Sequence, residues 1–411
     1  MKRHLSYSFW LALTAVGAWS CSAGAPASLD DSVDDSAPAG GSTGQAGGSG
    51  IAAANSGLTL AAGGPHPFPV SQKPANCSLT TAAGAPAAVQ SAYNLWKSQY
   101  VTAGGAGTAL RVVRPQNQND TVSEGIGYGM LASVYMADRQ TFDGLWAYAK
   151  SHFDGNGLMT WQINSSNAPI GMGSALDGDE DMAWALLQAS DQWNDASYLN
   201  DAISVINAIL NTTVAGDGLL RPGDNWGGSP KTFPDYFSPA YYRVFALVTN
   251  NKNWSGAVID RNYTLLSNVS GTYGLVPDAS NASSQPDPMT PNYTYDACRT
   301  PWRIGMDYCF NGEMRAKAYL DKVAAFFNSQ GAVSNIGDGY TTSGTKTSSY
   351  PNMAFIGPAG VSGMAGTQTL LDGAFAYGAT GNGGTLSYFA QSLRVVTMMM
   401  MSGNFVDFTK P

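Results

Sequence analysis

The chain has 411 residues, enough for one large domain or two ordinary ones, and its 12% of charged residues is about half the usual ~25%. The formal net charge of −8 argues against nucleic-acid binding, which calls for a basic surface. The histidines are His4, His66 and His152, so a Ser-His-Asp triad or a His-rich zinc site would depend on His152 alone, which excludes both as working hypotheses.

The first 21 residues have the pattern of an export signal. Basic residues precede an apolar run from Phe9 to Trp19, and small residues follow it. The run is shorter than the ~20 residues that a membrane span needs, so we expect no transmembrane anchor. Cys21 resembles a lipoprotein processing site, with cleavage near residues 23–25 as the alternative. Either route predicts a secreted or cell-surface protein.

Residues 22–66 form the predicted linker. Up to about Gly64 this segment is rich in Ala, Gly and Ser and has no aromatic residue. Such a composition cannot bury enough apolar surface to offset the entropy lost on ordering. We therefore assign residues 1–21 to a signal, 22–66 to a flexible linker and 67–411 to one folded domain.

From Ala87 onward, apolar residues recur at spacings of three and four, the period of helices packed against a core. The clearest groups, in chain order, are Ala92/Leu95/Trp96, Met130/Leu131/Val134/Tyr135, Leu145/Trp146/Tyr148/Ala149, Ala183/Leu186/Leu187/Ala189, Ile203/Ile206/Leu210, Tyr242/Val244/Phe245/Leu247, Leu370/Leu371/Phe375 and Phe389/Leu393/Val396. Alternating strand patterns are short and occur near Arg111–Val113 and Met159–Ile163.

This pattern predicts an all-α domain of about eleven or twelve helices with minor short strands. Several helices are apolar most of the way round, as expected when a helix is packed on two sides. A ring of helix pairs fits these observations, with a site at the end where the loops gather. An irregular helical domain is the alternative, which periodicity alone does not separate from a ring.

The positions of the cysteines exclude one disulfide pairing but do not select among the others. If Cys298 and Cys309 share a helix, a rise of about 1.5 Å per residue puts them roughly 16 Å apart, too far for a direct bridge. A bridge from Cys77 to either of them stays open. The chain has no CxxC pair or Cys/His cluster that indicates a metal site, and we expect no metal or cofactor.

Glu124 is the first candidate catalytic residue. Gly125, Gly127 and Gly129 follow it, and these residues let a ligand or another backbone approach closely. The alternative is a first-turn glutamate stabilised by the helix dipole. The glycines lack the full GxGxxG spacing of a dinucleotide loop and follow no convincing strand, so that interpretation is weak.

The acidic cluster Asp177–Asp181 superficially resembles a calcium loop. Met182 stands where such a loop needs glycine, and no glutamate follows at the required place. An acidic first helical turn is therefore the simpler interpretation. However, Asp177 and Asp181 lie four residues apart on one helix face, where like charges repel. This cost favours a function for at least one of them.

The third carboxylate is Asp296, at the start of a predicted helix with Pro301 in its first turn. Asp296 can be a simple helix cap. Alternatively, Arg299 keeps its carboxylate ionised, as a general base requires. Most large aromatic residues belong to cores, but Trp161 and Trp226 have polar, Gly-rich neighbours, which makes them candidates for stacking on sugar rings.

Together these segments resemble glycoside hydrolase family 8, over the chain from about residue 85 to its end. The segments that carry the resemblance, in the order of the family, are Val122–Met130, Ser174–Trp193, Asp235–Phe245, Tyr295–Tyr308 and Asn352–Pro358. The resemblance implies an (α/α)6 barrel and inverting hydrolysis of β-1,4 glycans, typically by an endoglucanase. It matches the family's general acid to Glu124, its general base to Asp296 and its substrate-binding aspartate to Asp177. Leu176 departs from the small polar residue usual before that aspartate.

We therefore expect an inverting endo-acting hydrolase of β-1,4-linked glucan that needs no cofactor and acts as a monomer. The remaining residues that we expect to contact substrate are Trp161, Trp226, Tyr236, Tyr295 and Arg299. The resemblance leaves chitosanase or xylanase activity as alternatives, although Asp296 favours the cellulase side, because chitosanase-type relatives tend to carry Asn there. The rival class is a helical toroid that binds glycans without turnover.

Overall fold

The computed structural model describes residues 64–226, 231–380 and 387–410. The predicted export signal, Cys21 and most of the predicted linker lie outside these residues. Within the described ranges, every helix is too short or too polar to cross a bilayer.

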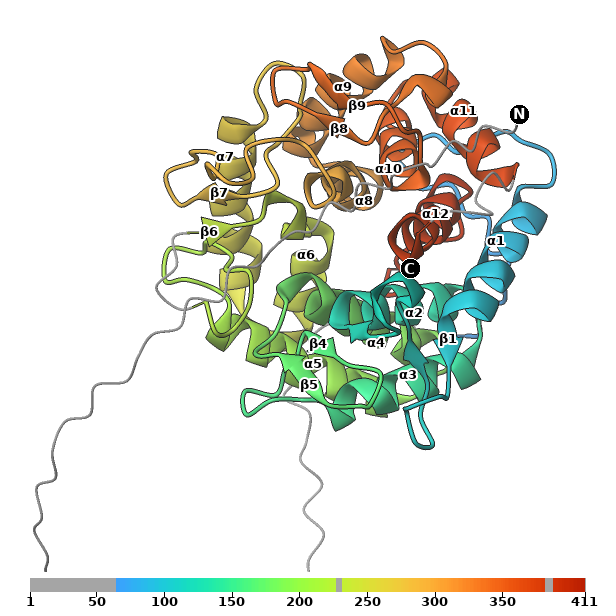
Figure 1. Cartoon of the computed structure of the whole chain (residues 1–411), viewed down its shortest axis with the longest axis vertical. Helices are drawn as coiled ribbons and strands as arrows, with labels where there is room; N and C mark the ends of the chain where they lie inside the picture. Colours follow the sequence, from blue (N-terminus) through green and yellow to red (C-terminus); the bar gives the residue numbers. More distant parts are fainter. Residues whose placement is uncertain (1–63, 227–230, 381–386, 411) are drawn as a thin grey trace, which may run out of the picture. The chain divides into compact units, whose positions relative to one another are not determined.

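Twelve α-helices dominate the architecture of the described chain (Figure 1). In order they are α1 (Ala85–Tyr100), α2 (Ser123–Tyr135), α3 (Arg139–Ser151), α4 (Leu176–Gln192), α5 (Ala196–Thr212), α6 (Pro239–Thr249), α7 (Ile259–Val269), α8 (Thr300–Asn311), α9 (Met314–Asn328), α10 (Met353–Gly363), α11 (Gln368–Ala379) and α12 (Tyr388–Met401). The all-α prediction is thereby confirmed.

The helices form an inner and an outer ring. The even-numbered helices are the more deeply buried set, and α4 and α10 are buried along their whole length. Around the inner ring, α6 packs on α8, α8 on α10, α10 on α12, α12 on α2, and α2 on α4. Trp184 of α4 stacks on Tyr241 of α6 with ring centroids 4.4 Å apart, which closes the circle. The odd-numbered helices lie outside, so the fold is the expected (α/α)6 barrel (Figure 1).

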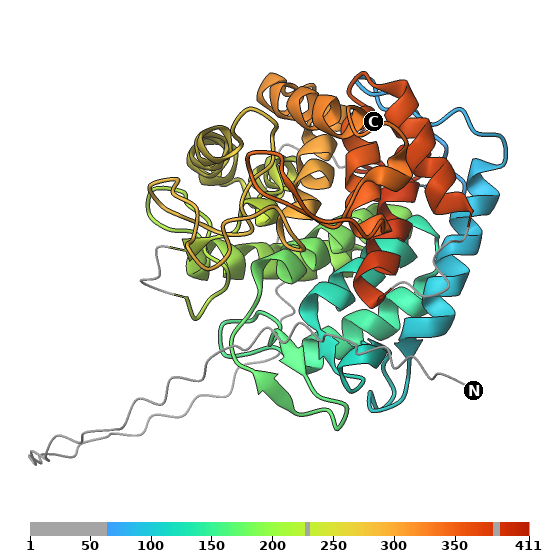
Figure 2. The same cartoon turned by 45° about the horizontal axis from the view of Figure 1, so that its top comes forward.

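Short strands occur only in the loops that lead from an outer helix to the next inner helix of the described chain. They are β1 (Val101–Thr102), β2 (Arg111–Val112), β3 (Thr121–Val122), β4 (Gln162–Ile163), β5 (Pro169–Gly171), β6 (Lys231–Thr232), β7 (Ser280–Asn281), β8 (Gly339–Tyr340) and β9 (Lys346–Ser348). All pair antiparallel, and β3–β4–β5 form a three-stranded sheet, of which β4 and β5 are green in Figure 2. These loops gather at the end of the barrel where the inner helices begin.

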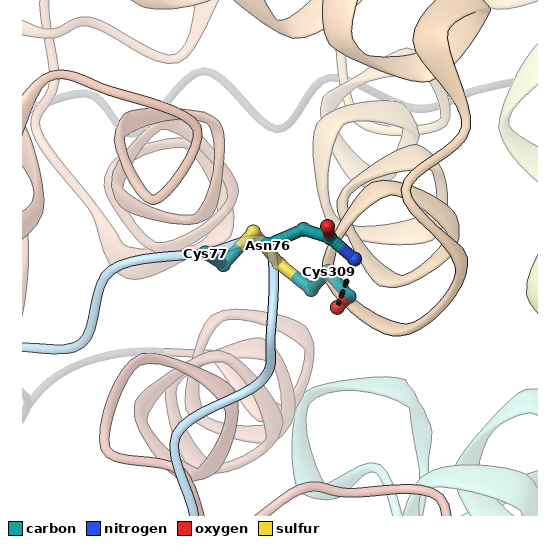
Figure 3. The surroundings of a disulfide bond; sticks show 3 residues. All are labelled: Asn76, Cys77 and Cys309. Carbon is teal, nitrogen blue, oxygen red and sulfur yellow. Dashed lines mark hydrogen bonds between the residues drawn. A yellow bond between two sulfur atoms is a disulfide. The ribbon is translucent and has the colours of Figure 1, made fainter.

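An extended N-terminal arm crosses the opposite end of the barrel, where the inner helices finish. Cys77 in this arm forms a disulfide with Cys309 near the end of α8, with their Cα atoms 5.0 Å apart (Figure 3). Asn76 beside it donates a hydrogen bond to the Cys309 carbonyl at 3.4 Å. Of the two pairings that the sequence left open, the structure thus forms Cys77–Cys309, and Cys298 is a buried free thiol.

His66 fixes the start of the arm to the last turn of α4. Its ring stacks on Phe408 at a centroid distance of 4.1 Å, and its Nε2 lies 2.7 Å from Asp191 Oδ2. Its backbone N–H donates to Gln192 Oε1 at 2.5 Å. His66, the residue that we assigned to the end of the linker, therefore packs against the folded domain.

Candidate active site

Two glycines let the first turns of α2 and α4 approach each other closely. A Cβ atom at Gly127 would lie 2.8 Å from the Cβ of Asp181, and one at Gly178 would lie 2.8 Å from the backbone nitrogen of Glu124. Neither distance tolerates a side chain. The close packing brings Glu124 and Asp177 to the same place at the loop end of the barrel.

The guanidinium of Arg299 joins four carboxyl groups and is only 2% exposed. Its Nη1 lies 2.7 Å from Glu124 Oε2 and 2.6 Å from Asp177 Oδ2. Its Nη2 lies 2.6 Å from Asp235 Oδ2 and 3.5 Å from Asp296 Oδ1. One cation thus faces four acidic groups, an arrangement in which neighbouring carboxylates raise one another's pKa.

Two arginines offset the repulsion between the two aspartates of α4. Arg299 and Arg303 are four residues apart, as are Asp177 and Asp181. Asp177 contacts Arg299, and Asp181 contacts Arg303, whose Nη2 lies 2.8 Å from Asp181 Oδ2. Asp181 is fully buried and also accepts a hydrogen bond from Tyr241 at 3.1 Å. Asp181 therefore belongs to a buried ion pair, whereas Asp177 lies beside Glu124.

Glu124 has the electrostatic setting of a general acid. Burial raises its pKa to about 7, against the opposing effect of Arg299 and with a further increase from Asp177. The hydroxyl of Tyr388 donates a hydrogen bond to Oε1 at 3.1 Å. Desolvation therefore outweighs both the arginine and the helix dipole at the start of α2, and the side chain can carry a proton near neutral pH.

Asp296 lies across Arg299 from Glu124 and is more open to solvent. Its side chain is 44% exposed, yet its partly enclosed position raises the pKa to about 6. Arg299 lowers this pKa, as expected from the sequence, while Asp278 and Asp177 raise it. The carboxyl group is thus partly exposed, so that it can reach both water and a ligand.

Exposed aromatic rings lie on the rim around these groups. The backbone carbonyl of Trp161 accepts a hydrogen bond from Ser123 at 3.0 Å, so this tryptophan lies beside the start of α2. The loop that carries Trp226 is tied to the start of α4 by a 2.9 Å bond from the Leu176 amide to the Pro222 carbonyl. The two indoles are 37% and 39% exposed, so their faces remain available to a ligand.

The two tyrosines predicted to contact substrate also lie here. The ring of Tyr236 faces Arg299, with the guanidinium carbon 5.4 Å from the ring centroid. Tyr295 is 43% exposed, and its hydroxyl donates to Asp338 Oδ2 at 2.6 Å. All the candidate residues from the sequence are therefore found at the loop end of the barrel, with the carboxylates at the centre and the aromatic rings around them.

Three residues at this centre were missed as site candidates. Asp235 begins one of the segments that carry the family resemblance, but the sequence analysis gave it no role of its own. Tyr388 contacts Glu124 across 264 positions of sequence, and Asp278 hydrogen bonds to the chain on either side of Asp296. Such distant contacts have no local sequence pattern. In the described ranges, no group of three or more His, Cys, Asp or Glu side chains could hold a metal ion.

Comparisons with known proteins agree with this geometry. The sequence model of glycosyl hydrolases family 8 matches residues 66–403. Endoglucanase A of Acetivibrio thermocellus is 40% identical over an alignment of 336 residues that covers 75% of this chain and 68% of that protein. The beta-glucanase of Niallia circulans is 36% identical over an alignment of 353 residues that covers 77% of this chain and 85% of that protein.

Solved structures show the same fold. The apo beta-1,3-1,4-glucanase from Paenibacillus sp. X4 superposes with a TM-score of 0.77 at 33% identity, covering 82% of this chain and 98% of that one. Rex8A from Paenibacillus barcinonensis, complexed with xylose, superposes with a TM-score of 0.69 at 21% identity, covering 78% and 93% of the two chains. The second likeness concerns the fold alone.

Proposed function

Because this chain belongs to glycoside hydrolase family 8, we propose that it is an inverting, endo-acting hydrolase of β-1,4-linked glucan, with Glu124 as general acid and Asp296 as general base. The observation that carries the proposal is that both carboxyls contact terminal nitrogens of one guanidinium. Contacts this short keep the two carboxyl groups within the upper limit of about 9.5 Å for an inverting pair.

The proposed reaction is a single displacement. Glu124 gives its proton to the glycosidic oxygen as the bond to the anomeric carbon breaks. Asp296 takes a proton from a water molecule on the opposite face of the sugar, and that water attacks the anomeric carbon. The product has the inverted configuration, and the two carboxyls exchange protons with solvent before the next turnover.

Arg299 and Asp177 prepare these groups for their roles. The fully buried Asp235 pairs with Nη2 of Arg299 and fixes the position of the guanidinium. This holds Nη1 of the same arginine against Glu124. Asp177 shares that nitrogen and keeps the pKa of Glu124 high through its negative charge. In our proposal its carboxylate also binds a substrate hydroxyl, and Tyr236 positions the attacking water.

The pH dependence of kcat/KM should be bell-shaped with its maximum between about pH 6 and 7. Asp296 must be ionised, so activity falls as pH drops below its pKa of about 6. Glu124 must be protonated, so activity falls as pH rises above its pKa of about 7. Initial rates of reducing-end release across the pH range test this. A profile that stays level into the alkaline range would contradict the assignment of Glu124.

The substrate proposal is β-1,4-linked glucan, cellulose or mixed-linkage β-glucan. The relatives reported above are named an endoglucanase, a beta-glucanase and a beta-1,3-1,4-glucanase. Exposed aromatic rings lie beside α2 and α4, at Trp161 and Trp226, and beside α10 and α12, at Tyr295. This spread around the barrel supports binding of sugar units on both sides of the cleaved bond. Binding on both sides is what an endo-acting enzyme needs.

A substrate panel separates this proposal from its rivals. We expect reducing ends to be released from carboxymethylcellulose and barley β-glucan, and little or none from xylan or chitosan. The Asp296→Asn protein, assayed in parallel, controls for contaminating activity. Release from chitosan or xylan alone would replace the glucanase proposal by a chitosanase or xylanase of the same fold. Binding of glucan without any release would indicate a non-catalytic toroid.

We also propose that the protein works outside the cytoplasm as a monomer. The export-signal pattern of residues 1–21 supports export, and the Cys77–Cys309 disulfide is typical of an oxidising compartment. A lipid anchor at Cys21 and a freely secreted form are the two versions of this proposal. Mass spectrometry of the mature N-terminus distinguishes them.

A further inference from the structure

Asp278 is a buried carboxylate that binds the loop carrying Asp296. It follows α7, and its Oδ1 accepts hydrogen bonds from the backbone N–H of Thr294 at 3.0 Å and of Ala297 at 2.8 Å. Its Oδ2 accepts from the Thr294 hydroxyl. These bonds hold the chain on both sides of Asp296, at the start of the short helix Ala297–Arg299 that leads into α8.

Asp296 occupies the N-cap position of that short helix but makes no capping hydrogen bond with its side chain. An aspartate at an N-cap ordinarily uses its carboxylate to accept a hydrogen bond from a first-turn N–H. Here the Ala297 N–H is already bound to Asp278. The N–H groups of Cys298 and Arg299 are bound to the backbone carbonyls of Thr294 and Asp296, so the first-turn donors are satisfied without the Asp296 carboxylate.

We propose that Asp278 is a positioning residue for the reaction: it caps the first turn before α8 in place of Asp296 and so leaves the Asp296 carboxylate free to face the substrate. The inference rests on the proposed role of Asp296 as general base. Asp278 is buried and does not itself reach the substrate.

Loss of Asp278 should change both the orientation and the charge around Asp296. Without an acceptor at position 278, the buried N–H of Ala297 would lose its hydrogen bond, and the turn that carries Asp296 would shift to restore it. The charged groups that act on Asp296 are Arg299 and Lys231, which lower its pKa, and Asp278 and Asp177, which raise it. Removing the charge at position 278 should therefore lower the pKa of Asp296.

The test compares kcat, KM and the acidic limb of the pH profile in Asp278→Asn and the wild type. Asparagine keeps the shape and one acceptor oxygen, so we expect a folded protein with little change in KM. We expect kcat to fall at least about tenfold, because small misplacements of a catalytic group are costly. The acidic limb should move to lower pH by about half a unit as a neighbouring negative charge is removed.

Two further variants separate the effects of charge and orientation. Asp278→Glu keeps the charge but displaces the carboxylate, so kcat should fall while the acidic limb stays near that of the wild type. Asp195→Asn is the matched control, because Asp195 caps α5 through a 3.1 Å bond from the Ser197 N–H. It lies outside the candidate site, and neither kcat nor the limb should change.

The outcomes are distinct from those that test the proposed function. An unchanged kcat and acidic limb in Asp278→Asn would overturn the inference. So would a lower melting temperature together with an unmoved limb, because a purely structural role predicts that result. If Asp296→Asn is itself fully active, the base assignment fails and takes this inference with it. If the Asp296→Asn protein is inactive but the Asp278→Asn protein behaves like the wild type, the proposed role of Asp278 is wrong while that of Asp296 stands.

Discussion

Replacement of Glu124 by glutamine should lower turnover on β-glucan by at least about 10²-fold, because the amide has no acidic proton to donate. The protein should still fold and bind oligosaccharide. Glutamine has the shape of glutamate, and its amide group can keep contacts with Arg299 and Tyr388, which now hold the carboxyl at 2.7 Å and 3.1 Å. The loss should therefore appear in kcat and not in KM.

The measurements are steady-state kinetics on soluble glucan and calorimetric binding of a cello-oligosaccharide. Glu313→Gln is a suitable control, since Glu313 pairs with Arg243 and Arg315 away from the carboxylate centre. This control should retain wild-type turnover. Activity of Glu124→Gln within a few-fold of the wild type would remove Glu124 from the mechanism. A leaving group that needs no protonation should recover much of the lost rate.

The second large effect concerns Asp296 and the configuration of the product. The first sugar released from a β-linked glucan should be the α-anomer, because a water activated by Asp296 attacks the face opposite the leaving group. Asp296→Asn should abolish turnover, and azide should restore part of the rate by replacing the activated water. Proton NMR of a fresh hydrolysate, recorded before mutarotation, identifies the anomer.

A retaining reaction gives the opposite result. There the second carboxylate would attack the sugar directly, at a carboxyl separation of about 5–5.5 Å, and the first product would be the β-anomer. An initial β-anomer would thus overturn the role of Asp296 as general base, even if Glu124 remained the acid. The wild-type protein and Asp195→Asn should give identical spectra, which controls for the handling of the sample.

Local sequence patterns were sufficient to predict the helices, whereas the ring arrangement and the pairing of Glu124 with Asp296 came from the family resemblance. The apolar period of three and four predicted the helices because buried faces repeat with the helical turn. The like charges of Asp177 and Asp181 favoured a function for at least one of them. In the structure both aspartates pair with arginines at the same spacing on the facing segment, Arg299 and Arg303.

Features that depend on the path of the chain could not be predicted in the same way. Geometry excluded a Cys298–Cys309 bridge, but the choice between two partners for Cys77 depends on the route of the N-terminal arm. The same is true of Asp278, which acts on a loop that begins sixteen residues later. The pKa of Asp296 was expected to be governed by Arg299, whereas its partial enclosure has the larger effect.

The N-terminal arm also determines at which end of the barrel a surface or a second protein module can be joined to the enzyme. His66 is bound at the last turn of α4, whereas Asp177 lies in the first turn of the same 17-residue helix, so about 22 Å of helix separates them at 1.5 Å per residue. Anything joined ahead of residue 64 is therefore connected at the pole of the barrel away from the carboxylates. A support, a fused module or a cell envelope joined through this arm is therefore connected to the domain without occupying the end that carries the carboxylates.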